Sequence, residues 1–309
     1  MGSARVAAAV FAACLPVAAA SAAGAPVVVT SILPVQGLAA GVMDGVGAPY
    51  LIVRGGASPH EYSLKPEDAR NLEHADVIVW VGPVMEAFLS GATKNASKHA
   101  KIIELDRVPG MKLWPARAGG PWEPDADEPL PPPSGAAIDG HLWLDPGNAA
   151  TAVTAIESTL SRIDPAHAAS YHANADRMRE GLAALDNDLA RELTPVRKEP
   201  FIVFHDAYQY LERRYELNAV GSVTISPEQQ PGARRLREIR RKIGELGARC
   251  VFREPEFEPR LLATVIGDAK VRRGTLDPEG ADIEPGPDAY FELMRRLGSA
   301  LAGCLAGTS

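Results

Sequence analysis

The stretch "AHAASYHANADRMREGLAALDNDLARELT", residues 166–194, decides how this chain is organised. Apolar side chains recur in it at steps of three and four residues and charged residues fill the opposite positions, as in an amphipathic helix. The apolar positions are Tyr171, Ala175, Met178, Leu182, Leu185, Leu189 and Leu193. About thirty helical residues span roughly 40 Å, which is longer than an ordinary connection. We therefore predict a rigid linking helix, residues 166–195, that joins two lobes and limits their relative motion.

Short apolar runs on both sides of this helix predict the lobes themselves. They alternate with helical patterns, which is typical of α/β architecture with mostly parallel sheets flanked by helices. The runs are "VVVTSI", "YLIVR", "DVIVWV" and "KIIEL" before the helix, and "FIVFH", "LNAVGSV", "CVFRE" and "KVRRGTL" after it. We predict one α/β lobe in residues 26–165 and a second in residues 196–309.

The first 25 residues, "MGSARVAAAVFAACLPVAAASAAGA", have the pattern of a secretory signal peptide. One early arginine and a short apolar run precede small residues with several A-x-A-like cleavage sites around Ala20 to Ala25. A lipid anchor on Cys14 is the alternative, but the preceding "FAA" fits a lipoprotein signal poorly. No other stretch is long enough to cross a bilayer, so we expect an exported mature chain without membrane insertion.

Composition excludes one class of partner. The chain has 309 residues, is 46% hydrophobic and 23% charged, and is therefore of ordinary globular type. Its formal net charge of −7 argues against nucleic acid, because backbone phosphates require clustered lysine and arginine.

Cleavage of the signal peptide leaves two cysteines, Cys250 and Cys304. Export takes them to a compartment that permits disulfides, so we predict that they pair. Two buried free thiols are the alternative.

One segment departs from the α/β pattern. Residues 115–137, "PARAGGPWEPDADEPLPPPSGAA", are rich in Gly and Pro and have little apolar content. They carry the four carboxylates of Glu123, Asp125, Asp127 and Glu128. We predict a mobile acidic surface loop.

The seven histidines fall into two groups. Four of them lie in helical patterns among polar neighbours, where we expect solvated side chains: His74, His99, His167 and His172. The other three, His60, His141 and His205, each lie where a strand or extended run gives way to a turn. Ligands of open α/β sheets collect beyond the carboxyl ends of the strands, so these three side chains can converge on one site.

Asp277, in "GTLDPEG", lies at an equivalent position after the last predicted strand. Taken alone, an aspartate before proline is turn chemistry. Three neutral imidazoles and one carboxylate, however, complete a four-coordinate shell for Zn²⁺. Asp206 is adjacent to His205, and we expect it to be the N-cap of the helix in "AYQYLERRY".

The chain resembles the metal-binding solute receptors of bacterial ABC importers, and most closely their periplasmic zinc-uptake branch, the ZnuA type. The stretches that carry the resemblance span nearly the whole mature chain: "GASPHEYSLKPEDA", "DGHLWLDPGNAA", "DPAHAASYHANA", "FIVFHDAYQYLERRY", "CVFREPEF" and "GTLDPEG". The resemblance implies two α/β lobes joined by a rigid helix, with one metal ion as cargo in the cleft. The implied partner is an ABC permease with its ATPase, and the implied location is the periplasm, with the receptor a monomer.

Carried over by motif, the implied metal ligands are His60, His141, His205 and Asp277, with Glu61 or water as alternatives for the fourth position. Relatives that resemble manganese carriers tend to have glutamate at the position of His205. Histidine here therefore favours Zn²⁺ over Mn²⁺ or Fe²⁺, the cargoes of the second candidate function. Zinc-type relatives also have a cysteine pair at the positions of Cys250 and Cys304. They commonly have a histidine-rich mobile loop where residues 115–137 contain no histidine.

Two further functions compete with transport. An exported zinc hydrolase would use three histidines, a bound water and Glu61 as general base, but the chain has no H-E-x-x-H pair. A metal-binding adhesin or extracytoplasmic chaperone would need no transporter. We predict a receptor for Zn²⁺ transport and not an enzyme.

Overall fold

The computed structural model describes residues 24–96, 100–117, 138–224, 237, 240–241, 243–245, 247–255, 266–267 and 270–307. The predicted signal peptide lies outside this part of the chain except for its last two residues, and so does the acidic segment from residue 118 to 137. Within the described residues, no helix combines the length and apolar character that crossing a membrane requires.

The first lobe is built on a four-stranded sheet in which all strands are parallel. Its order is β2-β1-β3-β4, from β1 (Val28–Thr30), β2 (Tyr50–Leu51), β3 (Val77–Trp80) and β4 (Lys101–Glu104). Every residue of β3 is buried, as expected for a strand covered on both faces. The helices of this part of the chain are α1 (Leu33–Val42), α2 (Pro66–Glu73), α3 (Leu89–Asn95) and α4 (Pro146–Ile163).

The second lobe repeats the plan. Its sheet is again parallel, in the order β6-β5-β7-β8, from β5 (Phe201–His205), β6 (Ala219–Thr224), β7 (Cys250–Arg253) and β8 (Arg272–Thr275). Described helices of this lobe are α6 (Gln209–Tyr215) and α9 (Ala289–Ala306). All eight predicted strands are confirmed, most of them shorter than the apolar runs that predicted them.

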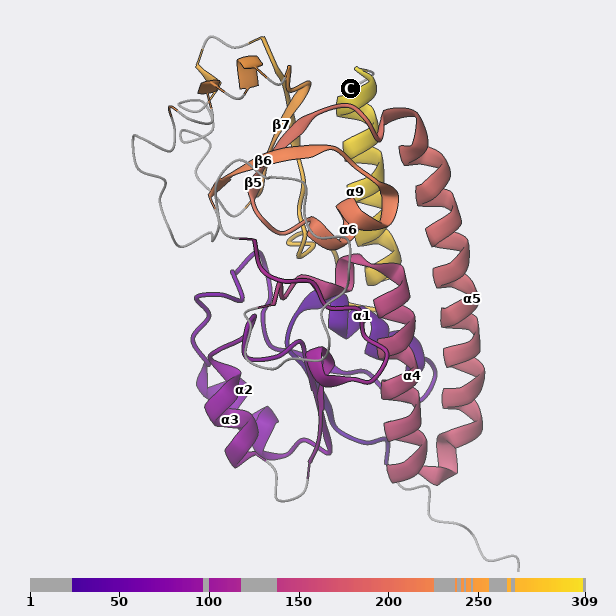
Figure 1. Ribbon diagram of the computed structural model, residues 1–309. Helices are drawn as coiled ribbons and strands as arrows, with labels where there is room; N and C mark the ends of the chain where they lie inside the picture. The colour runs from indigo at the N-terminus through magenta and orange to yellow at the C-terminus, as the bar shows by residue number, and fades with distance from the viewer. Residues whose placement is uncertain are drawn as a thin grey trace, which may run out of the picture.

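The predicted linking helix is α5 (Ala168–Leu193), 26 residues long, with 3₁₀ turns at Pro165–His167 and Thr194–Val196. It runs along one side of the molecule beside both lobes (Figure 1). All seven apolar positions that predicted it are buried. Each large apolar side chain among them contributes about 1.5–3 kcal/mol by leaving water, so packing fixes this helix along its length.

Helix α1 ties the two lobes together. It is buried along its whole length and contacts both α5 and α9. Two glycines permit this approach: a Cβ on Gly41 would overlap the sulfur of Met178 in α5, and one on Gly37 would lie 2.8 Å from the backbone nitrogen of Tyr290 in α9. An element of the first lobe is therefore packed tightly against a helix of the second.

Polar contacts strengthen the same junction. The Arg214 guanidinium in α6 donates to Asp145 Oδ1, the N-cap of α4, at 2.8 Å, and also to Asp186 in α5. Trp143 Nε1 donates to the carbonyl of Pro278 at 2.9 Å. Hydrogen bonds from Arg214 and Trp143 thus link helix α5 and the start of α4 to the second lobe.

The predicted disulfide is present. Cys250 at the start of β7 is bonded to Cys304 in α9, with the two Cα atoms 6.2 Å apart. The bond fastens the C-terminal helix to the second sheet.

The four histidines that we expected on the surface fare differently. His74 and His172 are exposed, whereas His167 is partly buried and its Nδ1 lies 2.7 Å from Asp164 Oδ2. His99 lies outside the described residues.

Candidate metal centre

His60 lies in the connection between β2 and α2. The chain turns before it at Gly55 and Gly56, whose φ angles of 66° and 73° are readily adopted only by glycine. The backbone N–H of His60 donates to Ser58 Oγ at 3.3 Å. The local sequence therefore brings the imidazole back toward the ends of the strands.

His141 comes directly before the 3₁₀ turn Leu142–Leu144 that leads into α4. Asp139 holds it twice: Oδ1 accepts the backbone N–H at 3.0 Å and the ring Nδ1–H at 2.7 Å. The carboxylate assigns the proton to Nδ1, so the lone pair of Nε2 faces the site. Both side chains are buried.

His205 is the last residue of β5 and is also buried. Its Nδ1 donates to Glu254 Oε2 at 2.6 Å, and Tyr208 donates its hydroxyl to the other oxygen, Oε1, at 3.1 Å. Glu254 directly follows β7, the strand next to β5 in the sheet. Glu254 thus orients the imidazole of His205 as Asp139 orients that of His141.

The three imidazoles meet. One nitrogen of each ring lies within 4.8 Å of the others. Among the described residues, these three form the group of His, Cys, Asp or Glu side chains whose ligand atoms come this close together. The ring centroid of His60 is 5.6 Å from that of His141 and 6.1 Å from that of His205. Nε2 of His141 and Nε2 of His205 are 3.2 Å apart. Two ligands at 2.0–2.1 Å in tetrahedral geometry are separated by about 3.3 Å, so this pair is already spaced for Zn²⁺.

The surroundings of His60 and His205 shift the pKa values of these two rings in opposite directions. Burial lowers the pKa of His60 to about 3, and the neighbouring charges of His141 and His205 act in the same direction. Burial alone would also lower the pKa of His205, but the charge and hydrogen bond of Glu254 outweigh it and raise that pKa above its ordinary value. His60 is therefore neutral near pH 7, as a metal ligand must be, while a proton competes for His205.

The histidines line a cavity of about 230 Å³, together with Arg117, Asp139 and Asp206. Asp206 is not the N-cap that we predicted, because α6 begins later, at Gln209. Its Oδ1 instead accepts from Arg117 Nη1 at 3.0 Å. The pairing partner lies 89 positions away in sequence, which is why the local pattern was misleading.

Asp277 and Glu61 do not belong to the group of donor atoms that meet within 4.8 Å. The Asp277 carboxylate accepts three backbone N–H groups, from Glu279 at 3.0 Å and from Gly280 and Ala281 at 2.7 Å each, which is the turn chemistry of an isolated aspartate. Burial raises its pKa, against these hydrogen bonds, and the nearby charge of Glu254 adds to the rise. Glu61 is exposed.

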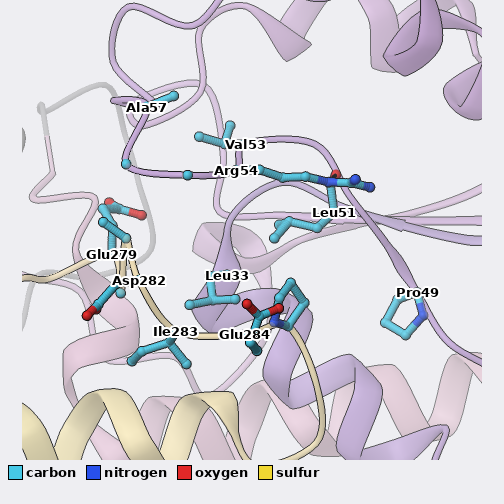
Figure 2. A pocket seen from close by; sticks show the side chains of 15 residues that line it. Leu33, Pro49, Leu51, Val53, Arg54, Ala57, Glu279, Asp282, Ile283 and Glu284 are labelled. Atoms are coloured by element: carbon cyan, nitrogen blue, oxygen red, sulfur yellow. Dashed lines mark hydrogen bonds between the residues drawn. The ribbon is translucent and has the colours of Figure 1, made fainter.

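A larger cavity of about 470 Å³ lies between residues 49–57 of the first lobe and residues 279–285 of the second. Figure 2 shows Arg54 on one wall and Asp282 and Ile283 on the other. Its lining contains no histidine or cysteine. The donor set for a transition metal is therefore in the smaller cavity.

The sequence did not identify Asp139 and Glu254. "DGH" places an acid two residues before His141, and the predicted strand "CVFRE" ends on an acid, so both signals were present. The pairing of Glu254 with His205 spans 49 residues and requires the sheet order β5-β7.

Known proteins resemble this chain in sequence and in fold. Residues 28–304 match the family model described as zinc-uptake complex component A, periplasmic. The high-affinity zinc uptake system protein ZnuA of Brucella suis biovar 1 (strain 1330) is 44% identical over 305 residues, covering 90% of this chain and 91% of the relative. The protein of the same name from Paracoccus denitrificans (strain Pd 1222) is 37% identical over 299 residues, covering 91% and 92%.

The fold agrees as well. A solved crystal structure of ZnuA superposes with a TM-score of 0.76 at 24% identity, covering 91% of this chain and 99% of the solved one. Two parallel sheets, a long connecting helix and a histidine cluster thus coincide with a sequence match over nearly the whole chain. This chain belongs to the ZnuA family, the periplasmic component A of zinc-uptake complexes.

Proposed function

We propose that this chain captures Zn²⁺ in the periplasm and delivers it to an ABC permease for import. The observation that carries the proposal is the meeting of His60, His141 and His205, which come from three distant segments and from both lobes. Imidazole nitrogen suits Zn²⁺, whereas Mn²⁺ prefers oxygen ligands. Relatives named as high-affinity zinc uptake proteins support the same cargo.

The hydrogen bonds of the cluster support cation binding. Both His141 and His205 donate Nδ1–H to a carboxylate, so their two Nε2 lone pairs face each other at 3.2 Å. Two acceptors at this distance repel unless a proton or a metal ion lies between them. The arrangement therefore favours uptake of a cation, and Asp139 and Glu254 increase the basicity of the two ligands.

For the fourth position we propose Asp277, with water and Glu61 as alternatives. A carboxylate offers about four lone-pair sites, so the three backbone N–H groups leave Asp277 with acceptor capacity. Glu254 follows β7 and Asp277 follows β8, the strand paired with it, so the two carboxylates lie at the same edge of the second sheet. A Zn²⁺ titration of Asp277→Asn and Glu61→Gln distinguishes these choices: the ligand's variant loses affinity, and neither does if water is the ligand.

We propose a receptor rather than an enzyme. The three histidines are buried or partly buried and come from both lobes, a geometry suited to enclosing a cargo ion. Glu61, the general base of the hydrolase alternative, is exposed and absent from the donor group. Hydrolysis of esters or peptides by the pure zinc-loaded protein would contradict this assignment.

The proposed partner is an ABC permease with its ATPase, and the receptor acts as a monomer. The predicted signal peptide, residues 1–25, accounts for export, after which the mature chain remains in the periplasm. Deletion of the gene should abolish growth under zinc limitation, and added Zn²⁺ should restore it. Normal growth of the deletion strain together with lost surface adhesion would favour the adhesin alternative.

Metal content decides between cargoes. Protein purified from the periplasm is expected to hold one Zn²⁺ per chain, and Mn²⁺ is expected not to displace it at equal concentration. Recovery of Mn²⁺ or Fe²⁺ as the resident ion would overturn the choice of cargo while leaving the receptor assignment intact.

A further inference from the structure

The cavity of the three histidines contains a carboxylate whose charge is already engaged. Arg117 Nη1 donates to Asp206 Oδ1 at 3.0 Å, and Arg117 Nη2 donates to Glu212 Oε2 at 2.5 Å. The side chains of Arg117, Asp206 and Glu212 are only 8%, 8% and 5% exposed. The planar guanidinium fork bonds both acids at once, which a lysine ammonium on its flexible stem does poorly.

The position of Asp206 places this ion pair beside the three histidines. Asp206 directly follows His205 in sequence, and both residues line the same cavity as His60 and His141. The second acid that lines it, Asp139, is hydrogen-bonded to the backbone N–H and Nδ1–H of His141. Both carboxylates beside the imidazoles thus have partners other than a metal ion.

Oxygen and nitrogen donors select different cations. Carboxylate oxygen suits Mn²⁺, Mg²⁺ and Ca²⁺, whereas imidazole suits Zn²⁺. A carboxylate released into this cavity would add a hard, charged donor to a set of neutral nitrogens. Zn²⁺, which is already well served by imidazole, would gain less from it than Mn²⁺.

We propose that Arg117 is a specificity-determining residue: it holds the Asp206 carboxylate out of the ligand set and so keeps the site selective for Zn²⁺. This inference rests on the proposed binding of Zn²⁺ by His60, His141 and His205. Arg117 reaches Asp206 and Glu212 from a segment 89 and 95 positions earlier in the chain, so the selectivity device also joins the two lobes beside the cation.

The chain offers a matched control. Arg214 also makes ion pairs with two acids of other elements, Asp145 and Asp186, but it does not line the histidine cavity. Loss of Arg214 is expected to weaken the junction of the lobes without releasing a carboxylate next to the metal. A purely structural role for Arg117 would make the two arginines behave alike.

The test compares Arg117→Met, the double variant Arg117→Met/Asp206→Asn, and Arg214→Met as mature full-length chains. The dissociation constants of Zn²⁺ and of Mn²⁺ are measured by competition with a chelating indicator, and the melting temperature of each metal-free protein is recorded. Arg117→Met is expected to lower the preference for Zn²⁺ over Mn²⁺ by roughly tenfold, the scale of change typical of residues that act on metal ligands. The double variant is expected to regain the preference within about twofold, on the same scale.

Arg214→Met is expected to lower the melting temperature and leave the metal preference unchanged. An unchanged preference in Arg117→Met, or a double variant as altered as the single one, overturns the inference. If Arg117→Met does not fold, Arg117→Lys decides instead: a smaller fall in the same direction supports the inference and an unchanged preference overturns it. Failure of the wild-type protein to bind Zn²⁺ would contradict the proposed function itself, which is a separate outcome.

Discussion

Glu254 should control zinc affinity although we do not expect it to touch the metal. Its Oε2 accepts from His205 Nδ1 at 2.6 Å, and both side chains are almost completely buried. Glu254→Gln keeps the size of the side chain and a hydrogen-bonding oxygen for Tyr208, but removes the negative charge. That charge stabilises the positive character which His205 acquires when it binds Zn²⁺. Loss of such a partner typically costs 10–100-fold in affinity, or about 1.4–2.7 kcal/mol.

The assay is a competitive zinc titration at pH 7.5, with the melting temperature of the metal-free protein measured in parallel. Glu86→Gln is the matched control, because Glu86 is also fully buried and accepts from the backbone N–H groups of Val81 and Gly82, but does not line the histidine cavity. We expect the control to lose stability and keep its zinc affinity. Wild-type affinity in Glu254→Gln, or an equal loss in both variants, would show that the charge of Glu254 does not control zinc affinity.

Three further predictions concern the pH dependence of zinc binding, the ligand His205 and the disulfide. Zinc affinity should fall as pH drops from 8 to 6, because a proton competes with the metal for His205, whose pKa is raised. His60, with a pKa of about 3, does not take up a proton in this range. Calorimetry in buffers of different ionisation enthalpy should show proton release on zinc binding, which His205→Ala reduces and His60→Ala does not. His205→Glu brings a second buried carboxylate against Glu254, and comparative titrations should show weaker Zn²⁺ binding and a smaller preference over Mn²⁺. Cys250→Ser removes a bond between residues 54 positions apart, which lowers the free energy of unfolding by roughly 4 kcal/mol in the chain-entropy model. Calorimetry should show a melting temperature lower by about 10 °C, and an unchanged value would contradict the structural role of the bond.

The fold was predictable because its signals are local. The apolar spacing from Tyr171 to Leu193 defines the buried face of α5, and the apolar runs define the strands. Each of these patterns is formed by residues that lie a few positions apart in the sequence. Helix ends were predicted to within two residues, and the two 3₁₀ turns that flank α5 account for the difference. The same locality explains the three candidate ligands, since each follows from a strand or extended run that gives way to a turn.

The partners of those ligands were not predictable in the same way. Glu254 meets His205 only because β7 lies beside β5, and Arg117 meets Asp206 only because the two lobes close against each other. Such contacts depend on sheet order and lobe packing, which no short pattern encodes. Asp206 is an example: its local sequence pattern is that of a helix N-cap, but its carboxylate pairs with the guanidinium of Arg117, which is distant in sequence.

X-ray absorption at the zinc edge of the stoichiometrically loaded protein shows whether three imidazoles bind one zinc ion. We expect three imidazole ligands at about 2.0–2.1 Å in a four-coordinate shell. Loss of one imidazole from the spectrum is expected in each of His60→Ala, His141→Ala and His205→Ala. A wild-type spectrum with fewer than three imidazoles, or one that any of these substitutions leaves unchanged, would contradict this expectation.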